Sequence, residues 1–155
     1  MEAKDPYISG KVSTDAYAQK CPVQGVVVAV LRGSVPDRGL SLIPQPSRAV
    51  RQGEVHELIV TPEDAGPGDR VAQIAYLAFV EFNNGGVILS GDLVTEASGA
   101  VLGVLSGYDM SHYPNHMNIV LRGDLRSGEE RGLPLGTKVS FAKRPRDPQP
   151  KGGST

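Results

Sequence analysis

Residues 71–82 read VAQIAYLAFVEF, and this stretch decides the fold that the sequence predicts. Apolar side chains occupy both alternating positions of the run, so a strand here needs cover on both of its faces. Residues 83–86 follow as NNGG and predict a tight hairpin turn with positive φ angles. Such a strand belongs inside a closed or two-layer β structure.

Short apolar runs punctuated by Gly and Pro continue this pattern along the chain. The 155 residues include 19 Gly and 12 Pro. Further strands are expected at 23–31, 40–43, 54–61, 86–89, 92–95, 101–105, 116–122 and 138–142. The pattern predicts an all-β, single-domain β-barrel of about seven or eight mostly antiparallel strands, with a β-sandwich as the alternative.

The domain organisation follows from the same punctuation. We expect an N-terminal extension at 1–22, a β-barrel domain at 23–143 and a disordered tail at 144–155, where Pro, Gly and charged residues accumulate. The first residues lack the apolar core of a signal peptide, and no run approaches the length of a membrane span. The expected location is therefore the cytoplasm.

Composition argues against several classes of partner. The charges nearly cancel, with 16 Lys and Arg against 17 Asp and Glu, so no overall field attracts nucleic acid or acidic lipid. Aromatic residues make up 5% and Trp is absent, which disfavours a base-stacking surface. The expected partner is a small molecule, and neither nucleic acid nor a membrane is expected.

The three histidines fall in two short segments, 53–58 (GEVHEL) and 109–118 (DMSHYPNHMN), which suggests a common site. Pro114 forbids a regular helix across the second segment, so His112 and His116 are not the i, i+4 pair of a helical zinc site. The segment predicts a loop that enters the strand at 116–122.

Alternation along these strands assigns side chains to faces. Glu54 and His56 share one face of their strand, with Leu58 and Val60, while Glu57 lies on the other. Along 116–122, the alternation separates an apolar face from a polar stripe. The stripe consists of His116, Asn118, Val120 and Arg122. A small barrel can hold one ligand inside, and we expect this stripe to line that interior.

A carboxylate beside an imidazole can tune it for general acid–base catalysis near neutral pH. The candidate catalytic residues are His116, His56, His112, Glu54 and Asp109. In this scheme His116 and His56 exchange protons, and Glu54 or Asp109 orients an imidazole. The candidate substrate-binding residues are Arg48, Arg51, Asn118, Tyr113 and Arg122.

No cofactor is expected in that scheme, and an alternative uses a metal. His56, His112 and His116, with Glu54 or Asp109, have the donor chemistry for Zn or Fe, although no recognised ligand spacing supports it. A third alternative is a non-catalytic ligand-binding or assembly module. There, an exposed edge strand at 40–43 supports pairing into a homo-oligomer.

Residues 53–58 (GEVHEL) and 114–120 (PNHMNIV) resemble a family of small, uncharacterised bacterial proteins associated with secondary-metabolite biosynthesis. The resemblance spans roughly residues 24–142. It implies a biosynthetic setting and carries no mechanism. Combined with the histidine clusters, it favours an isomerase, cyclase, lyase or hydrolase type of enzyme acting on a small organic substrate.

Overall fold

The computed structural model describes residues 16–144, and nearly all regular structure in this range is β-strand. The strands are β1 (Val23–Val30), β2 (Ser34–Val35), β3 (Leu40–Ser41), β4 (Ser47–Val50), β5 (Val55–Thr61), β6 (Arg70–Val71), β7 (Ile74–Phe82), β8 (Gly86–Leu89), β9 (Leu93–Glu96), β10 (Val101–Asp109), β11 (Asn118–Arg122) and β12 (Lys138–Ala142). The one regular helix in this range is α2 (Gly128–Arg131).

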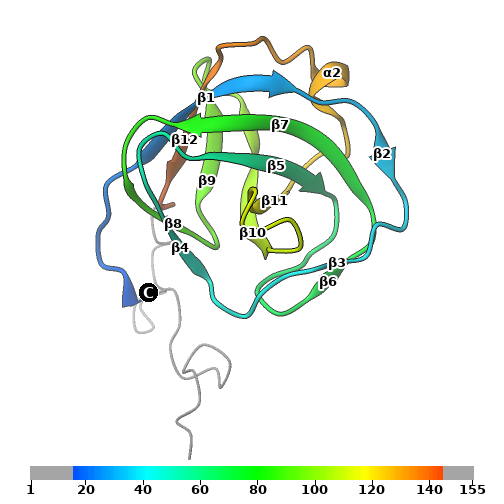
Figure 1. Cartoon of the computed structure of the whole chain (residues 1–155), viewed down its shortest axis with the longest axis horizontal. Coiled ribbons are helices and arrows are strands. Elements are labelled where there is room, and N and C mark those ends of the chain that lie inside the picture. Colours follow the sequence, from blue (N-terminus) through cyan, green and yellow to red (C-terminus); the bar gives the residue numbers. More distant parts are fainter. Residues whose placement is uncertain (1–15, 145–155) are drawn as a thin grey trace, which may run out of the picture.

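Seven strands close into a ring, which confirms the predicted all-β barrel (Figure 1). Their order is β1-β12-β9-β10-β11-β5-β7, and β1 also pairs with β7 to complete the circle. Every pair in the ring is antiparallel except β5 and β11, which run parallel. Two small pairs, β3–β6 and β4–β8, lie against the ring.

Side chains fill the barrel, which corrects the expectation of a polar interior. The main apolar cluster takes Leu58 from β5, Val80 from β7, Ile119 from β11 and Phe141 from β12, all at most 1% exposed. A barrel of this size is just wide enough for such side chains. The predicted polar stripe of β11 is therefore turned outward, and its apolar face fills the interior.

A second apolar cluster covers the outside of β5, β7 and β11. Ile59 and Val120 project outward from the ring and are buried by Leu40 and Leu42 of the β3 segment. This outer layer explains why residues 74–82 are apolar on both faces. It also corrects the expected exposed edge strand, because β3 pairs with β6 and buries its leucines.

The prediction of a hairpin turn at 83–86 is wrong. None of these residues has a positive φ, and β7 and β8 do not pair: β8 pairs with β4 instead. The Asn84 side chain accepts a hydrogen bond from the Gln24 backbone N–H and donates one to the Pro22 carbonyl, which docks the segment on the start of β1. The hairpin between β9 and β10 does form, and Gly99 has a φ of 91° in its turn.

Part of the expected N-terminal extension packs on the barrel. Tyr17 donates a hydrogen bond to Ser47 of β4, and Lys20 reaches the buried Asp92. The rest of the extension, residues 1–15, and nearly all of the expected tail, 145–155, lie outside the described residues. Within the described range, no helix is long and apolar enough to cross a membrane.

Candidate functional site

A row of three polar side chains crosses the outer face of the barrel. Glu57 on β5 lies opposite Asn118 on β11, which in turn lies opposite Asp109 at the end of β10. Register partners on adjacent strands point to the same face of a sheet. All three residues are less than 9% exposed, so the row is a buried polar layer that requires hydrogen-bond partners.

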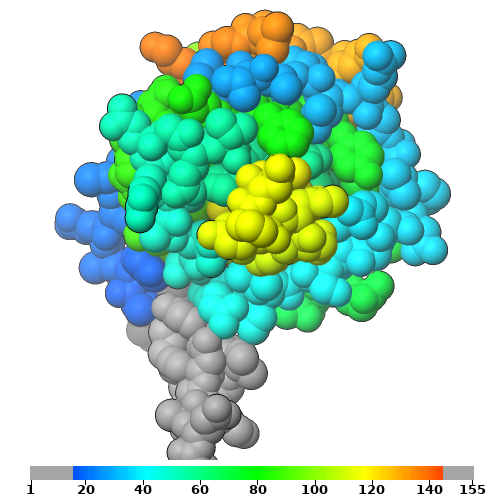
Figure 2. Space-filling view, in the orientation of Figure 1, coloured from blue at the N-terminus to red at the C-terminus, as the bar shows by residue number. Residues whose placement is uncertain are grey.

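The loop after β10 brings two histidines to this row. Its turns are held by backbone hydrogen bonds from Tyr113 to Met110 and from Asn115 and His116 to the His112 carbonyl. This confirms that the segment forms a loop and not a helix. Figure 2 shows the loop as the yellow group of atoms near the centre of the visible face.

His116 is the contact between the loop and the row. Its Nε2 lies 3.2 Å from Glu57 Oε1, and its Nδ1 lies 2.7 Å from Asn115 Oδ1. The Phe79 ring meets the imidazole edge-on at 5.0 Å between centroids. Because the Asn115 oxygen only accepts, that hydrogen bond requires a hydrogen on Nδ1, and a hydrogen bond between Nε2 and Glu57 then requires a proton on one of these two groups.

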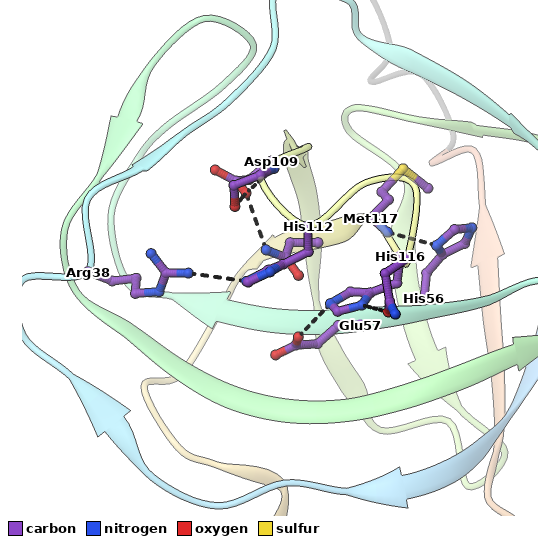
Figure 3. A network of polar contacts seen from close by, with 10 residues as sticks. Arg38, His56, Glu57, Asp109, His112, His116 and Met117 are labelled. Atoms are coloured by element: carbon purple, nitrogen blue, oxygen red, sulfur yellow. Dashed lines mark hydrogen bonds and ion pairs between the residues drawn. The ribbon is translucent and has the colours of Figure 1, made fainter.

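His112 and Arg38 extend the site toward solvent. The His112 ring stacks on His116 with centroids 5.2 Å apart, and Arg38 Nη2 lies 3.5 Å from His112 Nε2 (Figure 3). Since a guanidinium only donates, this approach is a hydrogen bond only where Nε2 of His112 is the accepting nitrogen.

The environment changes how readily Glu57 takes a proton. Burial raises the pKa of Glu57, and the charges of His116, His112 and Arg38 act in the opposite direction without cancelling it. A carboxyl whose pKa is raised, next to an imidazole, is the arrangement used for general acid–base chemistry near neutral pH.

Asp109 is an anchor and contacts no imidazole, which differs from the role expected for it. It accepts hydrogen bonds from the backbone and side chain of Ser111, the Ser41 backbone and Asn118 Nδ2. Its burial acts to raise its pKa, but these hydrogen bonds outweigh burial and lower it. The charged carboxylate thereby ties the loop, β3 and β11 together.

His56 lies on the opposite face of β5 from this cluster, and its ring points away from His116 (Figure 3). Its Nδ1 accepts a hydrogen bond from the Met117 backbone N–H at 2.9 Å, and its Nε2 lies 2.7 Å from Glu54 Oε1. Both nitrogens are therefore engaged, with Nε2 carrying the hydrogen. The expected proton exchange between His56 and His116 does not fit this geometry.

Glu54 does meet the imidazole that the sequence suggested for it. Partial burial acts to raise its pKa, but hydrogen bonds from His56 and the Arg51 backbone outweigh burial and lower it. The Glu54–His56 pair fixes the start of β11 through Met117. The pair thereby holds the residue next to His116 in place from the opposite face of the sheet.

The expected substrate-binding residues are divided between two regions. Asn118 belongs to the polar row, and its Oδ1 has no hydrogen-bond partner among residues 16–144. Arg48 lies 5.7 Å from the Tyr113 ring centroid, beside the loop. Arg51 is exposed before β5, and Arg122 lies at the far end of β11, where it pairs with Asp64 at 3.1 Å.

Sequence reasoning missed Glu57 as a site residue and left Arg38 out of the expected substrate-binding set. Alternation placed Glu57 with Val55 and Ile59, and nothing local indicates that it meets His116. Nothing local indicates that Arg38, 74 positions before His112, contacts that histidine. Only the pairing of β5 with β11 and the path of the chain before β3 bring them together.

The structure places the three histidines of the metal alternative on two different faces of the sheet. Within the described range, no three His, Cys, Asp or Glu side chains gather in a way that could hold a metal ion. Two surface hollows lie away from the cluster: about 290 Å³ beside Gln24 and Lys138, and about 600 Å³ beside Arg122. Within the cluster His112 is exposed, whereas the His116 and Glu57 side chains are 14% and 10% exposed.

Comparison with known proteins gives one family. The profile of DUF6917, described as a family of unknown function, matches residues 17–142, which include the whole barrel and the cluster. No curated protein and no solved structure gives a significant match.

Proposed function

The chain belongs to the DUF6917 family of unknown function, and we propose that it is an acid–base enzyme acting on a small organic molecule at the Glu57–His116 pair. The observation that carries the proposal is the 3.2 Å contact between Glu57 Oε1 and His116 Nε2, with His116 Nδ1 held 2.7 Å from Asn115 Oδ1. A pair that holds one proton can take up a second from a substrate and return it at another position.

The chemistry balances with the residues of this site alone. A substrate C–H bond breaks, its electron pair remains on the substrate as an enolate, and the proton joins the Glu57 carboxyl. The pair then returns the proton to another atom of the same substrate, which restores the resting state. This sequence describes an isomerase, and the same uptake and return of a proton serves a cyclase or a lyase.

Two further residues support such a reaction. The exposed His112 offers an imidazole N–H as a hydrogen-bond donor to charge that develops on the substrate. The anchored Asp109 holds the loop that carries both histidines. No metal or organic cofactor is needed in this proposal.

The experiment is deuterium incorporation in D₂O with a panel of small molecules that carry acidic C–H groups, followed by proton NMR. We expect incorporation with the native chain and a loss of at least about tenfold in Glu57→Gln and in His116→Gln, since positioned acid–base groups contribute factors of this size or more. Asp64→Asn, an exposed carboxylate outside the site, is the matched control and should retain the native rate.

Two results would overturn the proposal. Incorporation that persists in Glu57→Gln would remove this pair from the chemistry, and no incorporation across the panel would remove proton abstraction. Metal analysis of protein purified without a histidine tag tests the alternative: a stoichiometric first-row metal would favour a metalloenzyme.

The proposal includes a setting in bacterial secondary metabolism, and its support is the resemblance carried by residues 53–58 and 114–120. Disruption of the gene in its host, followed by metabolite profiling, tests this part. Loss or diversion of a secondary metabolite is expected, and an unchanged profile would contradict it.

A further inference from the structure

Arg38 is held in place by its backbone. Its N–H donates to the Ala72 carbonyl at 2.8 Å, and the chain then turns at Gly39, whose φ of 71° favours glycine, into β3. The side chain is half-buried and reaches the loop at His112 (Figure 3). The guanidinium is therefore positioned from a fixed point beside the Glu57–His116 pair.

Among the described residues, the guanidinium of Arg38 forms no ion pair within 4.0 Å, although its charge acts on Glu57. Its side chain instead approaches His112 Nε2 at 3.5 Å. Arg122 and Arg126 differ, since each lies near an aspartate, at 3.1 and 3.8 Å. Burial raises the pKa of Glu57, the acid of the site on which the Arg38 charge acts. Arg38 is thus the cationic side chain that contacts the exposed histidine of the cluster.

We propose, on the premise of the proton-transfer function above, that the substrate is a small carboxylate whose charged group binds the guanidinium of Arg38. The planar fork of arginine matches a carboxylate through two parallel hydrogen bonds. A carboxylate held there brings the rest of a small molecule alongside Glu57, His112 and His116. Carbon acids activated next to a carboxylate, such as 2-oxo acids, are the substrate class that this geometry serves.

A carboxylate fits better than a phosphate. Phosphate carries up to two negative charges and is usually met by several cationic or N–H donors. Here one guanidinium, that of Arg38, contacts the histidines, and the charged Asp109 lies in the polar row beneath them. A second negative charge would therefore be repelled more than it is stabilised.

The three histidines provide a direct readout, because an imidazole carbon–proton NMR spectrum contains one signal set for each. The protein is titrated with acetate, with acetamide as the neutral isostere and with inorganic phosphate, at constant ionic strength. Acetate should shift the His112 and His116 signals in a saturable way and leave His56 unchanged. Acetamide should shift none of them.

Variants locate the binding group. Arg38→Met should abolish the saturable shift, whereas Arg122→Met, an arginine at the other end of β11, should keep it. Saturation that survives Arg38→Met would overturn the proposal, as would equal shifts with acetamide. If phosphate bound more tightly than acetate, the carboxylate proposal would fail and the site would be assigned to a phosphate group.

This result is separable from the proposed function. Glu57→Gln should retain acetate binding while losing deuterium incorporation. If acetate binds but no incorporation occurs, the proton-transfer function fails and the anion site stands. If incorporation occurs without carboxylate binding at Arg38, the function stands and this inference fails.

Discussion

His116 Nε2 lies 3.2 Å from Glu57 Oε1, although 59 positions of sequence separate the two residues. The contact depends on the parallel pairing of β5 with β11, in which Glu57 lies opposite Asn118. A slip of one residue in that register would turn Glu57 to the interior. The site therefore exists because of strand register, and the following predictions test its parts.

Glu57→Gln should change the pH dependence of stability. Burial raises the pKa of Glu57 above its ordinary value near 4.5, against the charges of its neighbours. A carboxyl group whose pKa is raised by folding contributes stability that is present at low pH and is lost as pH rises through the folded-state pKa. Relative to the native chain, the unfolding free energy of Glu57→Gln should therefore increase from about pH 4 to about pH 7, as measured by urea unfolding.

Glu54→Gln is the matched control for that measurement, because its carboxyl is shifted the other way. Its hydrogen bonds outweigh partial burial and lower its pKa, so its contribution is present above the ordinary value near 4.5 and lost as pH falls through the folded pKa. The unfolding free energy of Glu54→Gln relative to the native chain should decrease over the same rise in pH. Equal slopes for the two variants would contradict the assignment.

Asp109→Asn should destabilise the fold at neutral pH by about 2 kcal/mol, because an amide nitrogen would then face backbone and hydroxyl donors. Asp109 contributes stability above its ordinary pKa near 3.8 that is lost as pH falls through its lowered folded pKa. The difference between variant and native chain should thus shrink in strong acid. Chemical unfolding measures it, and Asp64→Asn, part of an exposed pair, should stay within about 0.5 kcal/mol of native.

Lys20→Met should be costly although Lys20 lies outside the barrel strands. Its Nζ is 2.9 Å from Asp92 Oδ2, and the two side chains are 6% and 0% exposed. Removing the cation leaves a buried carboxylate without its counter-charge, a loss of about 3 kcal/mol. Thermal unfolding measures it, and Lys138→Met on the exposed side of β12 is the control.

Adding Asp92→Asn to that variant provides the decisive comparison. The double variant should be more stable than Lys20→Met alone, because the unpaired buried charge is gone. If the double variant were the less stable of the two, the cost would arise from packing of the lysine stem and not from charge.

His56→Ala should expose the Met117 backbone amide. The N–H donates to His56 Nδ1 at 2.9 Å, and the Met117 carbonyl accepts from the Glu57 backbone at 3.1 Å. Without the imidazole the amide loses its acceptor, so hydrogen exchange at Met117 should accelerate. The expected gain is at least about tenfold, the equivalent of roughly 1.4 kcal/mol. His112→Ala should leave that amide protected, and equal exchange in both variants would argue against the role given to His56.

The sequence predicted the strands themselves better than it predicted how they pack against one another. The alternation of β5 and β11 correctly separated His56 from Glu57, and the apolar face of β11 from its polar face. It did not reveal which of the two faces of β11 points inward. Burial of both faces, by the core inside and the β3 segment outside, leaves no local contrast to decide it.

The hairpin turn predicted at residues 83–86 does not form, for a related reason. Residues 83–86 have the composition of a hairpin turn, yet Asn84 binds the backbone of Gln24 and Pro22 and the next strand pairs with β4. A tertiary contact, made 60 residues away in sequence, outweighed the local preference.

What the sequence alone determined is the set of longer strands, without β2, β4 and β6, the faces within the strands it predicted, and the loop that carries His112 and His116. These depend on interactions between residues a few positions apart. Which strands pair, and in which register, depends on contacts between segments far apart in the chain. Only the tertiary structure therefore decided that Glu57 and Arg38 join the two histidines, and that the site lies on the outside of the barrel.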